Sequence, residues 1–293
     1  MLWRIVRCGM GPFTTLIDAP TLATQLGRED LVLFDCRAEL GNTRWGETQF
    51  AEAHLPGAQF LHLDRDLSGP ITPTSGRHPL PDPHELARRL GSLGAGPGCQ
   101  VVAYDQGHGA YAARLWWLMR WIGFREVAVL DGGIAAWRAA GLPVESTVRT
   151  PHARMLVAAP DMTAIVTSEE LAGLSQRPGN LLIDARGAER FAGRNETIDP
   201  VAGHVPGARS YPFTANVGDD GRFLPADVLR RRFETLLGAQ PSSALIAMCG
   251  SGVTACHNLL ALEHAGLRGA RLYAGSWSEW IRDPRRPIAT GSF

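Results

Sequence analysis

The stretch LVLFDCRAE at residues 31–39 decides how this chain is organised, because it returns as NLLIDARGAE at residues 180–189. Each copy is an apolar run that closes on Asp-x-Arg, and about 20 residues later each is followed by His-x-Pro-Gly-Ala. Further on, VVAYDQGHGAYAARL at residues 101–115 aligns with LIAMCGSGVTACHNL at residues 245–259. A repeat of about 145 residues has the size of a domain, so the sequence predicts a tandem of two homologous domains.

The domain boundaries follow from the repeat and from the stretch between its copies. We expect a first domain over residues 12–145, a linker over residues 146–162 and a second domain over residues 163–291. The linker region contains Pro151 and Pro160 and has no sustained amphipathic period. Such a composition is typical of a connection between domains.

Short apolar runs alternate with helical patterns inside each copy. In the first copy the runs at residues 31–35, 100–104 and 127–130 predict strands, and the patterns around residues 83–93 and 110–122 predict helices. Alternation of this kind favours an α/β fold. Each domain is therefore expected to hold a mainly parallel sheet with helices on both faces.

Composition excludes several classes of protein. The 293 residues carry 29 Lys+Arg and 29 Asp+Glu, so no positive excess attracts nucleic acid or an anionic membrane. The longest apolar runs fall far short of the ~20 residues that span a bilayer, and the first ten residues lack the apolar core of a secretory signal. Five cysteines without a C-x-x-C pair predict reduced thiols and no zinc site. We therefore expect a cytoplasmic protein with no nucleic acid, membrane or metal partner.

One cysteine follows a predicted strand at residues 244–248, at the edge of the sheet where ligands of α/β proteins bind. A helical pattern starts directly after its loop, and backbone N–H groups at such a helix start favour a thiolate. The sequence thus predicts a nucleophile, with a buried structural cysteine as the alternative. The first domain has Asp105 at the matching place, so that copy is expected to be inactive. The predicted active loop consists of Cys249, Gly250, Ser251, Gly252, Val253 and Thr254.

These motifs, together with GSWSEW at residues 275–280, resemble the tandem-domain rhodanese-type sulfurtransferases over about residues 15–291. The resemblance implies that Cys249 takes a sulfane sulfur from a small donor as a persulfide. It also implies transfer to cyanide, a small thiol or thioredoxin, without a metal or organic cofactor. The uncharged loop is similar to that of 3-mercaptopyruvate sulfurtransferases, whereas thiosulfate-preferring members carry basic residues there. We therefore expect 3-mercaptopyruvate as the donor, with thiosulfate as the alternative main donor.

The resemblance also implies roles for residues outside the loop. Arg190 matches a substrate-binding arginine of the family, and a guanidinium suits the carboxylate of a keto acid. Arg194 resembles a second substrate arginine, with a solvated surface charge as the alternative reading. Ser251, His78 and Asp64 match a proposed serine-protease-like relay that would move the proton of the donor thiol. The alternative for His78 is a loop histidine packed among prolines.

Two other functions use a cysteine in a cradle of backbone N–H groups. Cysteine phosphatases and arsenate reductases need a Cys-x5-Arg loop, in which the arginine binds the oxyanion. The sixth residue after Cys249 is Ala255, so the sequence argues against these activities. The remaining alternative is a sulfur-carrier module that accepts persulfide from a partner protein without turnover of small molecules. The sequence leaves this carrier, the oligomeric state and the physiological acceptor open.

Overall fold

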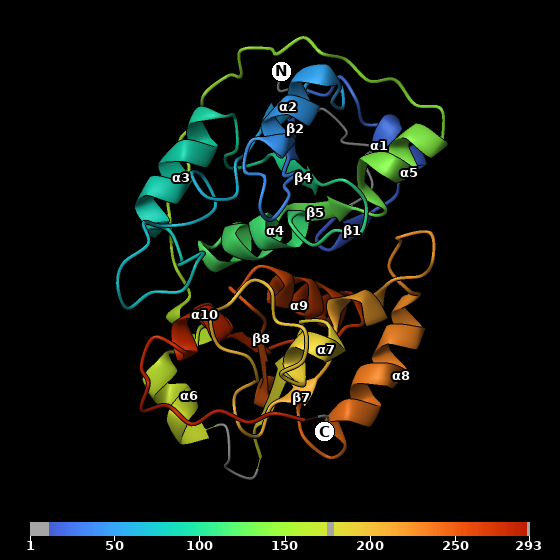
Figure 1. Ribbon diagram of the computed structural model, residues 1–293. Coiled ribbons are helices and arrows are strands. Elements are labelled where there is room, and N and C mark those ends of the chain that lie inside the picture. Colours follow the sequence, from blue (N-terminus) through green and yellow to red (C-terminus); the bar gives the residue numbers. More distant parts are fainter. Residues whose placement is uncertain (1–11, 175–178, 292–293) are drawn as a thin grey trace.

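The computed structural model describes residues 12–174 and 179–291, which form two α/β halves stacked one on the other (Figure 1). Each half contains its own sheet, and all paired strands in both sheets are parallel. Helices lie on both faces of each sheet. The predicted fold class is therefore confirmed.

The first half has a five-stranded sheet with the order β1-β5-β4-β2-β3. Alternate residues of β4 point to opposite faces, with Val101 and Ala103 on one side and Val102 and Tyr104 on the other. Helices α3 and α4 cover the first face, and α1, α2 and α5 cover the second. The elements are β1 (Leu16–Ile17), α1 (Ala19–Ala23), β2 (Leu31–Asp35), α2 (Trp45–Glu52), β3 (Gln59–Phe60), α3 (Pro83–Ser92), β4 (Gln100–Tyr104), α4 (Ala112–Trp121), β5 (Val127–Leu130) and α5 (Gly133–Ala139).

The second half repeats this plan with a four-stranded sheet in the order β7-β6-β8-β9. Helices α8 and α9 pack on one face of this sheet, and α6, α7 and α10 pack on the other. The elements are η1 (Met162–Ala164), α6 (Ser168–Leu174), β6 (Leu181–Asp184), α7 (Ala188–Phe191), β7 (Arg209–Ser210), η2 (Phe213–Asn216), α8 (Ala226–Leu237), η3 (Ser242–Ala244), β8 (Leu245–Met248), α9 (Thr254–His264), β9 (Arg271–Leu272) and α10 (Ser276–Trp280).

The repeated Asp-x-Arg motif is part of the scaffold in both halves. Arg37 donates to Asp35 at 2.6 Å, and Arg186 donates to Asp184 at 2.7 Å, with all four side chains buried. Each arginine also donates to a backbone carbonyl further along the chain. A buried ion pair is tolerable only when such hydrogen bonds satisfy it, so the motif joins the end of one strand to the loop that follows it.

The two halves meet through α4 and α9, which lie against each other in the middle of the molecule (Figure 1). Their buried side chains belong to one apolar cluster that continues from the first sheet to the second. Polar contacts cross the same interface: Arg120 pairs with Glu263 at 3.2 Å, and His257 donates from Nε2 to the carbonyl of His108 at 2.8 Å. Residues after β4 and β8 are therefore held in a fixed relation to each other.

Residues 146–161 carry no helix or strand and run along the outside of the first half (Figure 1). Their backbone is tied to that half, because Arg154 N donates to Gly91 O at 2.8 Å and Ala159 N donates to Ile122 O at 2.9 Å. An irregular connection of this kind suits the predicted linker. The exact domain boundaries remain a prediction.

No helix within the described ranges is long and apolar enough to cross a membrane. Four of the five cysteines lie in these ranges, and all four are free and buried: Cys36, Cys99, Cys249 and Cys256. The fifth, Cys8, lies outside the described residues.

Candidate active site

Cys249 follows β8 directly and lies at the bottom of a tight loop that leads into α9. Its side chain is buried, and the backbone N–H of Gly252 donates to its Sγ at 3.1 Å. Gly252 has a φ of +79°, and a Cβ at this position would lie 2.2 Å from the carbonyl oxygen of Ala274. Only glycine fits at this position, and its freedom at positive φ allows the tight turn of the loop around the sulfur. Val253 is buried behind the loop, and Thr254 opens the helix.

The segment that starts α10 holds the loop from the other side. Cys249 N donates to Ser276 Oγ at 3.0 Å, and Trp277 N donates to Cys249 O at 3.0 Å. Ser278 N donates to Gly250 O at 2.9 Å. The small residues of GSWSEW thus fix the backbone of the cysteine loop.

Ser251, His78 and Asp64 are brought together across the interface between the halves. Ser251 Oγ lies 2.7 Å from His78 Nδ1, and His78 Nε2 lies 3.2 Å from Asp64 Oδ1. An ionised carboxylate only accepts, so Nε2 carries the proton toward Asp64 and Nδ1 accepts from the Ser251 hydroxyl. This is the geometry that the predicted relay requires.

Burial and charge set the protonation of this group. Burial lowers the pKa of His78 below its ordinary 6.5, although the hydrogen bond to Asp64 opposes this shift. The same hydrogen bond lowers the pKa of Asp64, whose side chain is 44% exposed. At neutral pH the histidine is therefore an uncharged acceptor beside an ionised carboxylate.

Two arginines, one from each half, converge above the loop. A methyl group added at Gly250 would lie 3.0 Å from Arg77 Nη2 and within 3.7 Å of both terminal nitrogens of Arg190. The backbone of Arg77 is fixed in turn, because its N–H donates to Ser278 Oγ at 3.0 Å. Arg190, the predicted substrate arginine, thus lies next to the cysteine loop. Arg77 was missed, although it directly precedes His78, which the sequence did single out.

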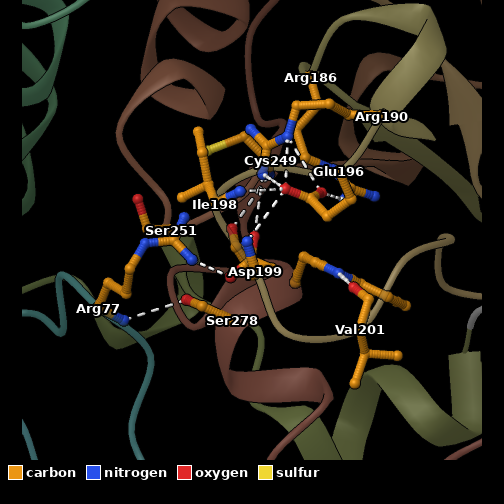
Figure 2. A network of polar contacts seen from close by, with 12 residues as sticks. Arg77, Arg186, Arg190, Glu196, Ile198, Asp199, Val201, Cys249, Ser251 and Ser278 are labelled. Carbon is orange, nitrogen blue, oxygen red and sulfur yellow. Dashed lines mark hydrogen bonds and ion pairs between the residues drawn. The ribbon is translucent and has the colours of Figure 1, made fainter. Parts of the chain in front are cut away.

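Two buried carboxylates hold these arginines (Figure 2). Asp199 bridges the halves, since one of its oxygens pairs with Arg77 and the other accepts from Arg190 Nη2 at 2.9 Å. Glu196 accepts from Arg190 Nε at 3.0 Å and from the backbone N–H of Asp199 at 3.0 Å. Sequence reasoning did not identify either acid.

Arg194 lies elsewhere. Its side chain is 59% exposed and pairs with Glu189 at 2.7 Å on the surface of the second half. The geometry therefore gives no support to the prediction that Arg194 is a second substrate arginine. The second guanidinium group beside Gly250 is that of Arg77, from the other half of the molecule.

Arg114 is a further residue that sequence reasoning missed. This α4 side chain is fully buried and donates to Gly252 O at 3.2 Å and to His78 O at 3.1 Å. It thereby ties the loop of the histidine to the loop of the cysteine. Burial lowers its pKa, and the thiol of Cys256 opposes that shift. A charged residue directly before the apolar run at residues 115–119 of α4 was the signal that could have found it.

The arrangement brings together a thiol with a backbone N–H donor, the Ser251–His78–Asp64 contacts and two guanidinium groups. No group of three or more His, Cys, Asp or Glu side chains suited to a metal ion occurs within residues 12–174 and 179–291. The site can therefore bind a small carboxylate-bearing or oxyanionic molecule beside a nucleophilic sulfur.

Comparison with known proteins gives a consistent result. The Rhodanese-like domain model matches residues 18–140 and 167–283. A probable 3-mercaptopyruvate sulfurtransferase of Pseudomonas aeruginosa is 51% identical over 278 residues, covering 94% of this chain and 98% of the relative. A putative thiosulfate sulfurtransferase of Mycobacterium tuberculosis is 36% identical over 282 residues, covering 94% of this chain and 97% of the relative.

Among solved structures, a 3-mercaptopyruvate sulfurtransferase from Leishmania major superimposes with a TM-score of 0.79 at 32% identity. The match covers 92% of this chain and 76% of that one. The fold therefore agrees over nearly the whole of this chain.

Proposed function

The chain belongs to the rhodanese family of sulfurtransferases, and on that premise we propose that it moves sulfur from 3-mercaptopyruvate through a persulfide on Cys249. The observation that carries this proposal is the position of Cys249 at the base of the loop, under Arg77 and Arg190. A donor carboxylate bound by these guanidinium groups would hold its sulfur next to the thiolate.

In the first step the Cys249 thiolate attacks the sulfur of the donor. A sulfur–sulfur bond forms, and the carbon–sulfur bond breaks with its electron pair on carbon, which gives the enolate of pyruvate. Ser251, with His78 and Asp64 behind it, takes the proton of the donor thiol and returns it to the enolate carbon. Pyruvate leaves, and the outer sulfur remains on Cys249 as a persulfide anion.

In the second step an acceptor attacks the outer sulfur and restores the Cys249 thiolate. Cyanide, a small thiol or thioredoxin would each serve as the acceptor. The backbone N–H of Gly252 supports both steps, because it donates toward the sulfur whose charge changes. The cytoplasmic location of this reaction remains a prediction.

Thiosulfate is the alternative donor. Residues 250–254 contain no lysine or arginine, which favours the monoanionic keto acid over a dianion. The name of the Pseudomonas aeruginosa relative supports the same choice. Some turnover with thiosulfate is expected, because Arg77 and Arg190 together also suit an oxyanion.

Steady-state turnover with 3-mercaptopyruvate and with thiosulfate, with cyanide as acceptor, tests the proposal. It is combined with the intact mass of the protein after each donor alone. We expect pyruvate to form faster than thiosulfate is consumed, and one added sulfur on the wild type but not on Cys249→Ser. Faster use of thiosulfate would contradict the donor choice. If neither donor adds sulfur, the cysteine is either loaded by a partner protein or structural, and the proposed enzymatic activity is wrong.

The two candidate substrate arginines are separated by Arg190→Ala and Arg194→Ala. Loss of Arg190 removes a guanidinium next to Gly250, so KM for 3-mercaptopyruvate should rise about tenfold or more. Arg194 pairs with Glu189 on the surface, so its loss should change KM less than about twofold. A rise in KM for Arg194→Ala as large as that for Arg190→Ala would support the predicted role of Arg194 as a second substrate arginine.

A further inference from the structure

Asp199 occupies an unusual position for an acid in a site that must bind anions. Its side chain is 2% exposed, and its two oxygens are divided between Arg77 of the first half and Arg190 of the second. These are the same two guanidinium groups that meet above Gly250. An entering donor anion therefore shares its cations with a fixed carboxylate (Figure 2).

The position of Asp199 is built in rather than accidental. Glu196 accepts from the backbone N–H groups of Ile198 and Asp199 at 2.9 and 3.0 Å, which closes a turn that presents the Asp199 side chain. Glu196 also accepts from Arg190 Nε at 3.0 Å. The turn and the arginine are thereby fixed to each other, so the acid cannot simply swing into solvent.

The charges at this point balance. Arg77 and Arg190 bring two positive charges, and Glu196 and Asp199 bring two negative charges. A partly buried site screens charge less than water does, so each added negative charge on the donor is felt strongly. Thiosulfate carries one more negative charge than 3-mercaptopyruvate does at neutral pH.

We propose that Asp199 is a specificity-determining residue: by neutralising one of the two guanidinium groups above Gly250, it favours monoanionic over dianionic sulfur donors. This inference rests on the proposed function, because it assumes that donors bind at Arg77 and Arg190. It goes further by assigning donor choice to an acid outside the cysteine loop. Removing its charge would leave the site one unit more positive and would favour the dianion.

The test compares Asp199→Asn with the wild type in kcat/KM for thiosulfate and for 3-mercaptopyruvate, with cyanide as acceptor. We expect the ratio of thiosulfate to 3-mercaptopyruvate to rise about tenfold or more, the effect of one unit charge at several ångströms. Glu189→Gln is the matched control, since it removes the acid that pairs with Arg194 on the exposed surface nearby. Its ratio should equal that of the wild type.

A second measurement needs no turnover and so separates this inference from the proposed function. Calorimetric titration gives the Kd for sulfate, a dianion, and for pyruvate, a monoanion. The ratio of the pyruvate Kd to the sulfate Kd should be about tenfold higher for Asp199→Asn than for the wild type. Asp199→Ser removes the same charge if the asparagine variant does not fold, and Asp199→Glu should retain the wild-type preference. An unchanged preference in the charge-removing variants overturns the inference. If the wild type shows no turnover with either donor, the proposed function is wrong. The preference for sulfate over pyruvate in the titrations would still test the role of Asp199.

Discussion

The loops after β4 and β8 occupy equivalent places in the two halves, but the first side chain of each loop accepts a different number of backbone hydrogen bonds. In the first half the Asp105 carboxylate accepts from four backbone N–H groups, those of Gly107, Gly109, Tyr111 and Ala112, at 2.9 to 3.3 Å. In the second half Cys249 Sγ accepts from one such group in the part of the chain that the structure describes, that of Gly252 at 3.1 Å.

This difference shows how one scaffold gives an inert loop and a reactive one. Both loops follow a parallel strand, a place where backbone N–H groups can stabilise an anion. In the first half a carboxylate of the chain itself satisfies these donors. In the second half the cysteine sulfur accepts from the N–H of Gly252. The inert loop also has a structural task, because the carbonyl of His108 accepts from His257 in the other half.

The strongest test of this comparison is to place the side chain of the inert loop in the reactive one. Cys249→Asp should abolish persulfide formation and reduce turnover at least about 10⁴-fold, because the nucleophile is lost. The thermal unfolding midpoint should stay near that of the wild type, because the new carboxylate can accept from the loop N–H groups. Intact mass after incubation with donor and a thermal melt measure both effects. Retained activity would show that Cys249 is not the nucleophile, and a collapse in stability would show that the two loops are not equivalent.

A second test alters the curvature of the reactive loop. Gly252→Ala places a Cβ 2.2 Å from the carbonyl oxygen of Ala274 at a φ of +79°. We expect turnover to fall about 10²-fold and the free energy of unfolding to fall by about 1–3 kcal/mol. Gly107→Ala in the inert loop is the control, since a Cβ there meets no atom within 4 Å. Chemical denaturation and steady-state kinetics measure both variants, and equal effects for the two would contradict the importance of loop shape.

A third test concerns the relay, which only the reactive loop can form through Ser251. Ser251→Ala should lower kcat for 3-mercaptopyruvate about tenfold and kcat for thiosulfate less than about twofold, because only the former has a thiol proton to move. Burial lowers the pKa of His78, so wild-type activity with 3-mercaptopyruvate should decline only as the pH falls below 6.5. The variant should lack this acidic decline. Equal losses for both donors would rule out the relay.

The smallest expected effect concerns the contact between the inert loop and α9. Burial lowers the pKa of His257 to about 3, so below pH 6.5 the unfolded chain binds a proton that the folded chain does not. The free energy of unfolding should therefore fall, as the pH drops from 6.5 toward 3, by up to about 1.4 kcal/mol per pH unit through this group.

His257→Gln should reduce that slope, and urea denaturation at pH 7, 6 and 5 would measure it. His84→Gln, which changes an exposed histidine, should leave the slope as it is in the wild type. An identical slope for wild type and His257→Gln would mean that His257 does not carry the acid sensitivity.

Local sequence patterns were enough to locate much of the fold. The predicted strands at residues 31–35, 100–104 and 127–130 coincide with β2, β4 and β5, because each is a short apolar run bounded by polar residues. The helix predicted around residues 110–122 is α4, which is shorter by two residues at its start and one at its end. Helix ends depend on loop contacts that a periodic pattern does not record.

The candidate site could be predicted only in part. Cys249 was found because its neighbours along the chain, two glycines and a following helix, create its surroundings. Arg190 was found through a motif. Arg77 and Asp199 were missed because each matters through a partner on a distant segment. Arg194 stays a prediction, and its sequence context does not reveal that it pairs with Glu189 on the surface.

The sequence by itself determined the tandem repeat, the parallel α/β architecture and the position of the candidate active loop, because these depend on residues that are near one another along the chain. Only the tertiary structure decided which cations and acids surround the sulfur. Arg77, His78, Asp64 and Arg114 come from the first half, and they reach the loop of the second half only because α4 packs against α9. That packing is driven by burial of apolar surface, which is not directional and leaves no local motif in the sequence.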